Sequence, residues 1–143
     1  MNIRALCVSA LLLVGSLVVL AQQDQVVYDE DVTLVDSVEA PYPSLAKVTS
    51  AAGDVVVSVT LNDDGSVKKA TPLSGNRILV MVATENAMKW RFKPNRQQRA
   101  VIVYEFRLTD KCTIVGESVF HVHPPNVASV SACIPPAVVD RVR

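Results

Sequence analysis

Residues 54–61 decide the fold and read DVVVSVTL. Apolar side chains stand at every second position of this stretch, as is typical of a half-buried β-strand; the positions are Val55, Val57, Val59 and Leu61. Residues 62–65 read NDDG, a turn sequence with glycine where a positive φ is expected. Residues 66–73 continue as a second strand, and Pro72 favours an edge position because proline donates no backbone hydrogen bond. The stretch therefore predicts a β-hairpin.

A helix and a third strand follow the hairpin. Residues 77–90 repeat apolar side chains at spacings of three and four, the pattern of an amphipathic helix. The stripe expected to face the hairpin contains Leu79, Val82, Ala83, Ala87 and Trp90. Residues 100–108 alternate again and predict a third strand. We therefore expect an α+β fold in two layers, a small antiparallel sheet in β-β-α-β order packed on one helix, with the core candidates Val57, Val59, Leu79, Val82, Trp90 and Phe106.

The first residues have the pattern of an export signal. Arg4 gives the start a positive charge, residues 5–20 are almost wholly apolar, and Ala21 is the small residue of a cleavage site. We expect cleavage after Ala21. The alternative is an uncleaved N-terminal anchor in the inner membrane, because the apolar run approaches the length of a spanning helix. Both interpretations place the chain in the periplasm, with an arm at 22–39, a domain at 40–108 and a C-terminal extension at 109–143.

Two cysteines remain after removal of the signal, Cys112 and Cys133. Because an exported protein meets an oxidising compartment, they are interpreted as one disulfide. The alternative is a pair of unbonded, buried thiols.

The composition excludes several classes of function. The chain has 143 residues with 14 basic and 14 acidic side chains, so it lacks the positive charge of a nucleic-acid-binding protein. No nucleophile stands in a catalytic motif, so neither enzymatic activity nor a cofactor is expected. His121 and His123 have a spacing compatible with a metal ion, but no third ligand lies near them in the sequence. They are interpreted as surface residues, and no metal site is expected.

Short motifs occur in a fixed order along the predicted domain. They are Tyr42-Pro43-x-x-Ala46, Gly53-x-Val55-x-Val57, Asp64-Gly65-x-Val67, Ser74-Gly75, the run AMKWRFKP at 87–94, and Phe106-Arg107-Leu108. Together they resemble the TonB C-terminal domain family over about half of the chain. The stretch between Ala21 and Pro41 is short and does not cluster proline, so the resemblance is to a TonB-like periplasmic protein without a Pro-rich spacer.

The resemblance implies a function as well as a fold. It implies that the domain binds an extended N-terminal segment of an outer-membrane TonB-dependent receptor, in energy-coupled transmembrane transport. The segment adds as a strand to the edge of the last strand of the sheet. Carried over by position, the partner-binding residues are Tyr42, Pro43, Val101, Val103, Glu105 and Arg107. The alternative is a secreted structural or assembly module that keeps the fold without energy transduction, and a homodimer is left open.

The C-terminal extension has an expected place as well. Four apolar side chains of the predicted helix lie away from its sheet-facing stripe, namely Ile78, Val80, Met81 and Met88. We expect residues 109–143 to fold back as a disulfide-stapled extension, as an added hairpin that covers them. Alternatively the extension lies beside the third strand, where it occludes the edge that the family uses for peptides.

Overall fold

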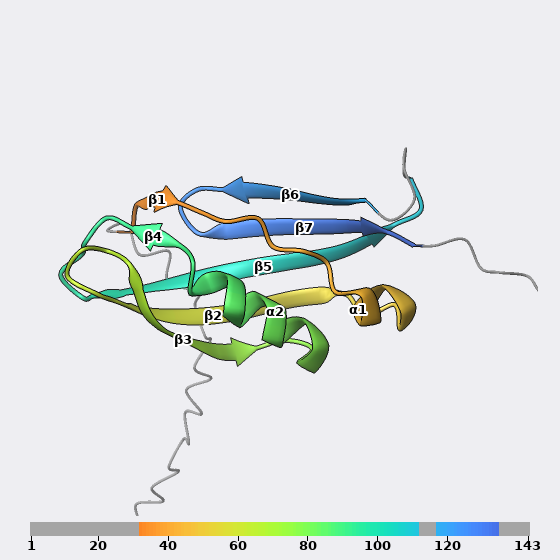
Figure 1. Cartoon of the computed structure of the whole chain (residues 1–143), viewed down its shortest axis with the longest axis horizontal. Coiled ribbons are helices and arrows are strands. Elements are labelled where there is room, and N and C mark those ends of the chain that lie inside the picture. The colour runs from red at the N-terminus through yellow and green to blue at the C-terminus, as the bar shows by residue number, and fades with distance from the viewer. Residues whose placement is uncertain (1–31, 112–116, 135–143) are drawn as a thin grey trace, which may run out of the picture.

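The computed structural model describes residues 32–111 and 117–134. Along the chain, the elements are β1 (Leu34–Asp36), α1 (Ser44–Val48), β2 (Gly53–Leu61), β3 (Val67–Ser74), α2 (Arg77–Ala87), β4 (Arg91–Phe92), β5 (Arg99–Thr109), β6 (Ser118–His123) and β7 (Val127–Cys133), as labelled in Figure 1. Residues 1–31, 112–116 and 135–143 lie outside the description, and with them the predicted signal and Cys112.

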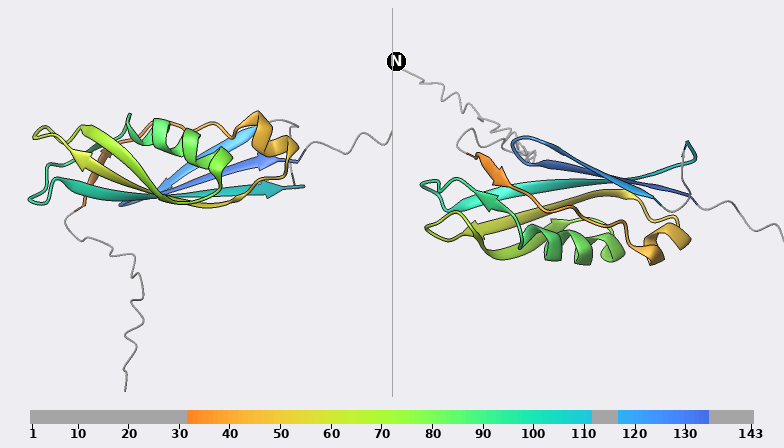
Figure 2. Two further views of the ribbon diagram at one scale, coloured as in Figure 1. Left: turned by 90° about the horizontal axis from the view of Figure 1, so that it is seen from below. Right: turned by 45° about the horizontal axis from the view of Figure 1, so that its top comes forward.

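A five-stranded sheet in the order β3-β2-β5-β7-β6 forms one layer of the domain. Neighbouring strands are antiparallel except for β5 and β7, which run parallel. The second layer consists of α1 and α2 on one face of this sheet, as Figure 2 shows, with α2 packed on β2, β3 and β5. A separate ribbon pairs β1 with β4. The expected α+β architecture is therefore confirmed, with two strands added beyond β5.

The predicted hairpin is present, and its glycine is required by geometry. Gly65 has a φ of 82°, and a Cβ atom there would overlap the carbonyl oxygen of Phe92. The two backbones approach this closely because the Phe92 amide donates a hydrogen bond to the Gly65 carbonyl at 2.9 Å. Only glycine combines this backbone conformation with this contact. The Asp-Gly turn therefore attaches the hairpin to β4 as well as reversing the chain.

Helix α2 begins as its sequence indicates and ends earlier. Asn76 caps the helix, since its side chain accepts a hydrogen bond from the Ile78 amide at 2.9 Å. The last helical residue is Ala87, so Trp90 is buried beyond the helix end. The buried face of α2 consists of Leu79, Ala83, Asn86 and Ala87. Val82, expected in the core, is only partly buried, whereas Val57, Val59, Leu79, Trp90 and Phe106 are all buried.

One polar side chain lies at the centre of the buried layer. The Asn86 amide nitrogen donates to the carbonyl oxygens of Val38 and Glu39, at 2.9 and 3.1 Å. Its oxygen accepts from Trp90 Nε1 at 2.8 Å and from the Tyr104 hydroxyl at 2.9 Å. All four hydrogen-bonding positions of the amide are therefore used. Burial raises the pKa of Tyr104, which keeps its hydroxyl a protonated donor.

The C-terminal extension forms a hairpin of β6 and β7, at the second of its two expected places. It lies beside β5, at the opposite edge of the sheet from β3 (Figure 1). The expectation that it covers α2 is wrong, because Met81 and Met88 are 63% and 43% exposed. Ile78 and Val80 need no such cover, since both pack against the core. Backbone pairing along β5 satisfies many polar groups at once, which contact with a helix surface does not offer.

We predict that Asn86→Ala lowers the free energy of unfolding by about 3 kcal/mol or more. The substitution leaves the Trp90 and Tyr104 donors buried without acceptors, each at about 1–3 kcal/mol. Urea denaturation followed by tryptophan fluorescence measures the loss. Asn62→Ala is the matched control, because Asn62 is exposed and its side chain donates to the Ser66 hydroxyl at 2.9 Å. Equal stability of the two variants contradicts the central role of Asn86.

Candidate functional site: the edges of the sheet

The edge of β5 that the family resemblance assigns to a partner is occupied by β7. Val103 pairs with Val127 at one end of this parallel ladder, and Thr109 pairs with Cys133 at the other. The Val103 amide donates to the Asn126 carbonyl at 2.9 Å, and the Ile134 amide donates to the Thr109 carbonyl at 3.0 Å. In a parallel ladder every second residue directs its backbone groups to the same neighbour. The backbone groups of Glu105 and Arg107 therefore also face β7.

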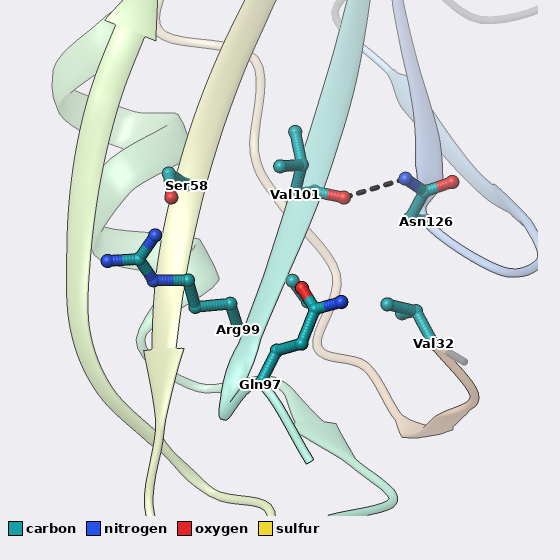
Figure 3. A pocket seen from close by; sticks show the side chains of 7 residues that line it. Val32, Ser58, Gln97, Arg99, Val101 and Asn126 are labelled. Carbon is teal, nitrogen blue, oxygen red and sulfur yellow. Dashed lines mark hydrogen bonds between the residues drawn. The ribbon is translucent and has the colours of Figure 1, made fainter. Parts of the chain in front are cut away.

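Asn126 extends the occupied edge by one more position. It lies in the turn between β6 and β7, is 4% exposed, and donates from Nδ2 to the carbonyl of Val101 at 2.7 Å (Figure 3). Val101, the remaining β5 residue expected to bind a partner, is thus engaged within the chain. Asn126 Oδ1 has no partner among the described residues. The side chain also lines an open pocket of about 320 Å³ at the start of β5, together with Val32, Ser58, Gln97, Arg99, Ala100 and Val101.

The β6–β7 hairpin is held against the rest of the sheet by apolar packing as well as by backbone hydrogen bonds. Ala128, Val130 and Ala132 of β7 are buried in the same core as β2 and β5. Phe120 and Val122 of β6 pack against that core from the edge. Burying one valine side chain is worth about 1.5–3 kcal/mol. Removing β7 from β5 would therefore expose core, in addition to breaking a strand ladder.

Glu105 and Arg107, two residues of the assigned partner site, make contacts on the open face of the sheet, which is the face that α1 and α2 do not cover. Arg107 Nη1 lies 2.6 Å from Asp54 Oδ1, and both side chains are about half exposed. Such a surface ion pair contributes at most about 1 kcal/mol. Ser129 Oγ on β7 donates to Glu105 Oε2 at 3.1 Å, which links β5 to β7 through side chains also.

Tyr42 and Pro43 make their contacts within the chain, with β5 and with the residues of α1 and the loop after it. Tyr42 is 4% exposed, its ring meets that of Phe106 edge-on at 5.4 Å, and its hydroxyl donates to the Ala51 carbonyl at 2.7 Å. Pro43 is the residue before α1, and its carbonyl accepts from the Lys47 amide. In this structure the pair anchors the segment before α1, and Tyr42 offers no surface to a partner.

Two outer strands remain within the described part of the sheet, β3 and β6. β3 carries Pro72 together with Lys68 and Lys69, and its register with β2 shifts twice. Proline, lysine and register irregularities protect natural edge strands from pairing with other chains. β6 has none of these features, since it reads SVFHVH and is regular along its length.

The remaining expectations concern histidine and cysteine. His121 and His123 are exposed on β6, and the described residues contain no group of three or more His, Cys, Asp or Glu side chains that could hold a metal ion. Cys133 is buried at the end of β7. Its pairing with Cys112 stays a prediction because Cys112 lies outside the described residues. Within the described residues, neither helix is long and apolar enough to cross a membrane.

Comparison with known proteins places this fold in a family. Residues 38–108 match the family described as the Gram-negative bacterial TonB protein C-terminal. A solution NMR structure of the Pseudomonas aeruginosa TonB C-terminal domain matches with 22% identity and a TM-score of 0.45, over 57% of this chain and 90% of that one. No curated protein gives a significant match. By the family match, residues 38–108 belong to the TonB C-terminal family.

This membership gives the chain a TonB-like role in receptor interaction. TonB C-terminal domains are periplasmic domains of interaction and transport, not enzymes, and they interact with outer-membrane receptors. The match ends at residue 108, within β5, so the β6–β7 hairpin lies entirely beyond it. The strand that fills the β5 edge is thus an addition to the matched region.

We predict that deleting residues 111–143 destabilises the domain and causes it to self-associate. The deletion uncovers the β5 edge and part of the core, with an expected loss of roughly 3 kcal/mol or more. Thermal denaturation and sedimentation velocity measure the two effects. Deletion of residues 135–143 alone is the control, because it leaves β7 intact. A 1–110 chain as stable and as monomeric as that control shows that the hairpin protects nothing.

Proposed function

We propose that this protein binds extended peptide segments of outer-membrane TonB-dependent receptors by strand addition, as part of energy-coupled transmembrane transport. The observation that carries the proposal is the family match over residues 38–108. A sheet with an unprotected outer strand supports strand addition as the mode of binding. Unpaired N–H and C=O groups along such a strand bind any extended backbone, and side chains select among the candidates.

A second function is favoured by one observation. The chain's own β7 occupies the β5 edge, to which the family resemblance assigns the partner. A secreted structural or assembly module that keeps the TonB fold without energy transduction has no need of that edge. Under this second function the protein contacts other copies of itself or other assembly proteins, and receptor segments do not bind.

A disulfide between Cys112 and Cys133 belongs to both proposals. Thr109 pairs directly with Cys133, and Cys112 follows Thr109 by only a few residues in the sequence. So short a stretch of chain can bring the two Cα atoms within the distance that a disulfide requires, about 4.4–6.8 Å. The bond staples the end of β7 to the end of β5 in an oxidising periplasm, which export through residues 1–21 would provide.

Peptide binding distinguishes the two functions. We expect synthetic peptides with the N-terminal segments of the source organism's TonB-dependent receptors to bind the mature chain in fluorescence anisotropy titrations. The matched control is the same peptide with alternate backbone nitrogens methylated, which keeps every side chain and removes donors to the sheet. Methylation on the bonding side should weaken binding by about tenfold or more. Absence of binding by every receptor peptide contradicts receptor recognition and favours the assembly module.

A further inference from the structure

We propose that the outer edge of β6 is the strand-accepting site of this protein, in place of the β5 edge. The inference rests on the proposed function, because it names the place where the receptor peptide adds. The partner is an extended peptide that alternates apolar and polar side chains. Three properties of the sheet lead to this assignment. The β5 edge is occupied by β7, the β3 edge carries features that oppose pairing with another strand, and β6 directs backbone groups outward.

The β5 edge is accessible to a peptide only if the chain gives up its own strand. Displacement of β7 breaks the ladder from Val103 to Thr109 and the side-chain bond from Asn126 to Val101. It also brings Val130, which has no exposed surface, into water. A peptide backbone arriving at β5 merely restores the bonds that β7 already makes. Addition at a free edge gains its bonds without that loss.

The β3 edge is poorly suited to a partner for a different reason. Pro72 lies in this outer strand, and proline is tolerated at positions whose missing N–H would face solvent. Lys68 and Lys69 place charges beside the same edge, and both are exposed. A strand added here would meet a gap in the row of donors and two lysine side chains to desolvate.

The backbone of β6 has its unpaired groups at alternate residues. On β7, Asn126 and Ile134 bond to β5, so the intervening odd-numbered residues direct their groups to β6. Their antiparallel partners are Val119, His121 and His123. The residues between those partners, Phe120 and Val122, therefore direct N–H and C=O outward. Among the described strands no neighbour pairs with this side of β6.

The two faces of β6 define the side chains of the partner. Phe120 and Val122 lie on the helix-covered face and pack against the core, so a strand added beside them extends the core with its own apolar side chains. Val119, His121 and His123 lie on the open face and are exposed, where polar side chains of the partner remain in water. β6 carries no acidic or basic side chain besides histidine. The partner is thus selected by an apolar–polar alternation over the length of β6, without proline at the bonding positions.

The test compares one proline substitution at each outer strand of the full mature chain. Val122→Pro removes an outward donor of β6 without removing a donor to β7, and should weaken binding of the receptor peptide by about tenfold or more. Ala70→Pro makes the same change on β3, two residues from the natural Pro72, and should leave the affinity within about twofold. Circular dichroism and thermal denaturation check that both variants keep the fold.

Amide hydrogen exchange of the wild-type chain tests the same site without any substitution. On binding, the amides of Phe120 and Val122 should gain protection while those of Ala128 and Val130 keep theirs. Equal affinity of Val122→Pro and wild type, or loss of protection along β7, overturns the assignment to β6 and leaves receptor binding intact. Protection of Phe120 and Val122 in a peptide-free dimer assigns the edge to a second copy instead. Failure of the wild-type chain to bind any receptor peptide overturns the proposed function and this inference together.

Discussion

Backbone pairing along β5 is the constraint on which the rest of the structure depends. This strand bonds β2 on one side and β7 on the other, and its inward side chains Ile102, Tyr104 and Phe106 form the middle of the core. A long central strand has to satisfy both rows of its polar groups. Within this chain the second row is satisfied by a strand that follows the family-matched region. The position of the free edge, and with it the place for a partner, follows from that single pairing.

A buried asparagine fixes the other layer against this strand. Asn86 joins the segment before α1 to the end of α2 and, through the Tyr104 hydroxyl, to β5. Tyr42 fastens the same segment from the other end by its contact with Phe106. A fully satisfied polar network of this kind favours one arrangement of the layers, because every alternative leaves a donor or acceptor buried without a partner. The network thereby holds α2 and the segment before α1 on one face of the sheet.

Local patterns predict the 54–73 hairpin, the helix that follows it and the strand at 100–108, but they do not predict which strands pair across the sheet. Three strands, β2, β3 and β5, are predicted by the alternation over residues 54–61 and 100–108 and by the NDDG turn. Alternation and turn sequences depend only on residues that are neighbours in the sequence. The sequence does not identify Asn86, because a polar residue in an apolar stripe does not show its distant partners. Helical spacing alone places Val82 inward. The sequence leaves two places for the C-terminal extension, because a hairpin expected there does not identify the strand or helix on which it packs. No motif marks Asn126, because its partner, the Val101 carbonyl, is distant from it in the sequence.

The central claim is that β7 occupies the β5 edge in the free protein, and amide hydrogen exchange by NMR tests it most directly. Glu105 and Arg107 direct their amides to β7, whereas Ile102 and Tyr104 direct theirs to β2. If β7 is seated, all four amides exchange slowly and at comparable rates, while that of Phe120 at the open edge exchanges fast. Fast exchange at Glu105 and Arg107, with Ile102 and Tyr104 still protected, would show that the β5 edge is open and would contradict the account.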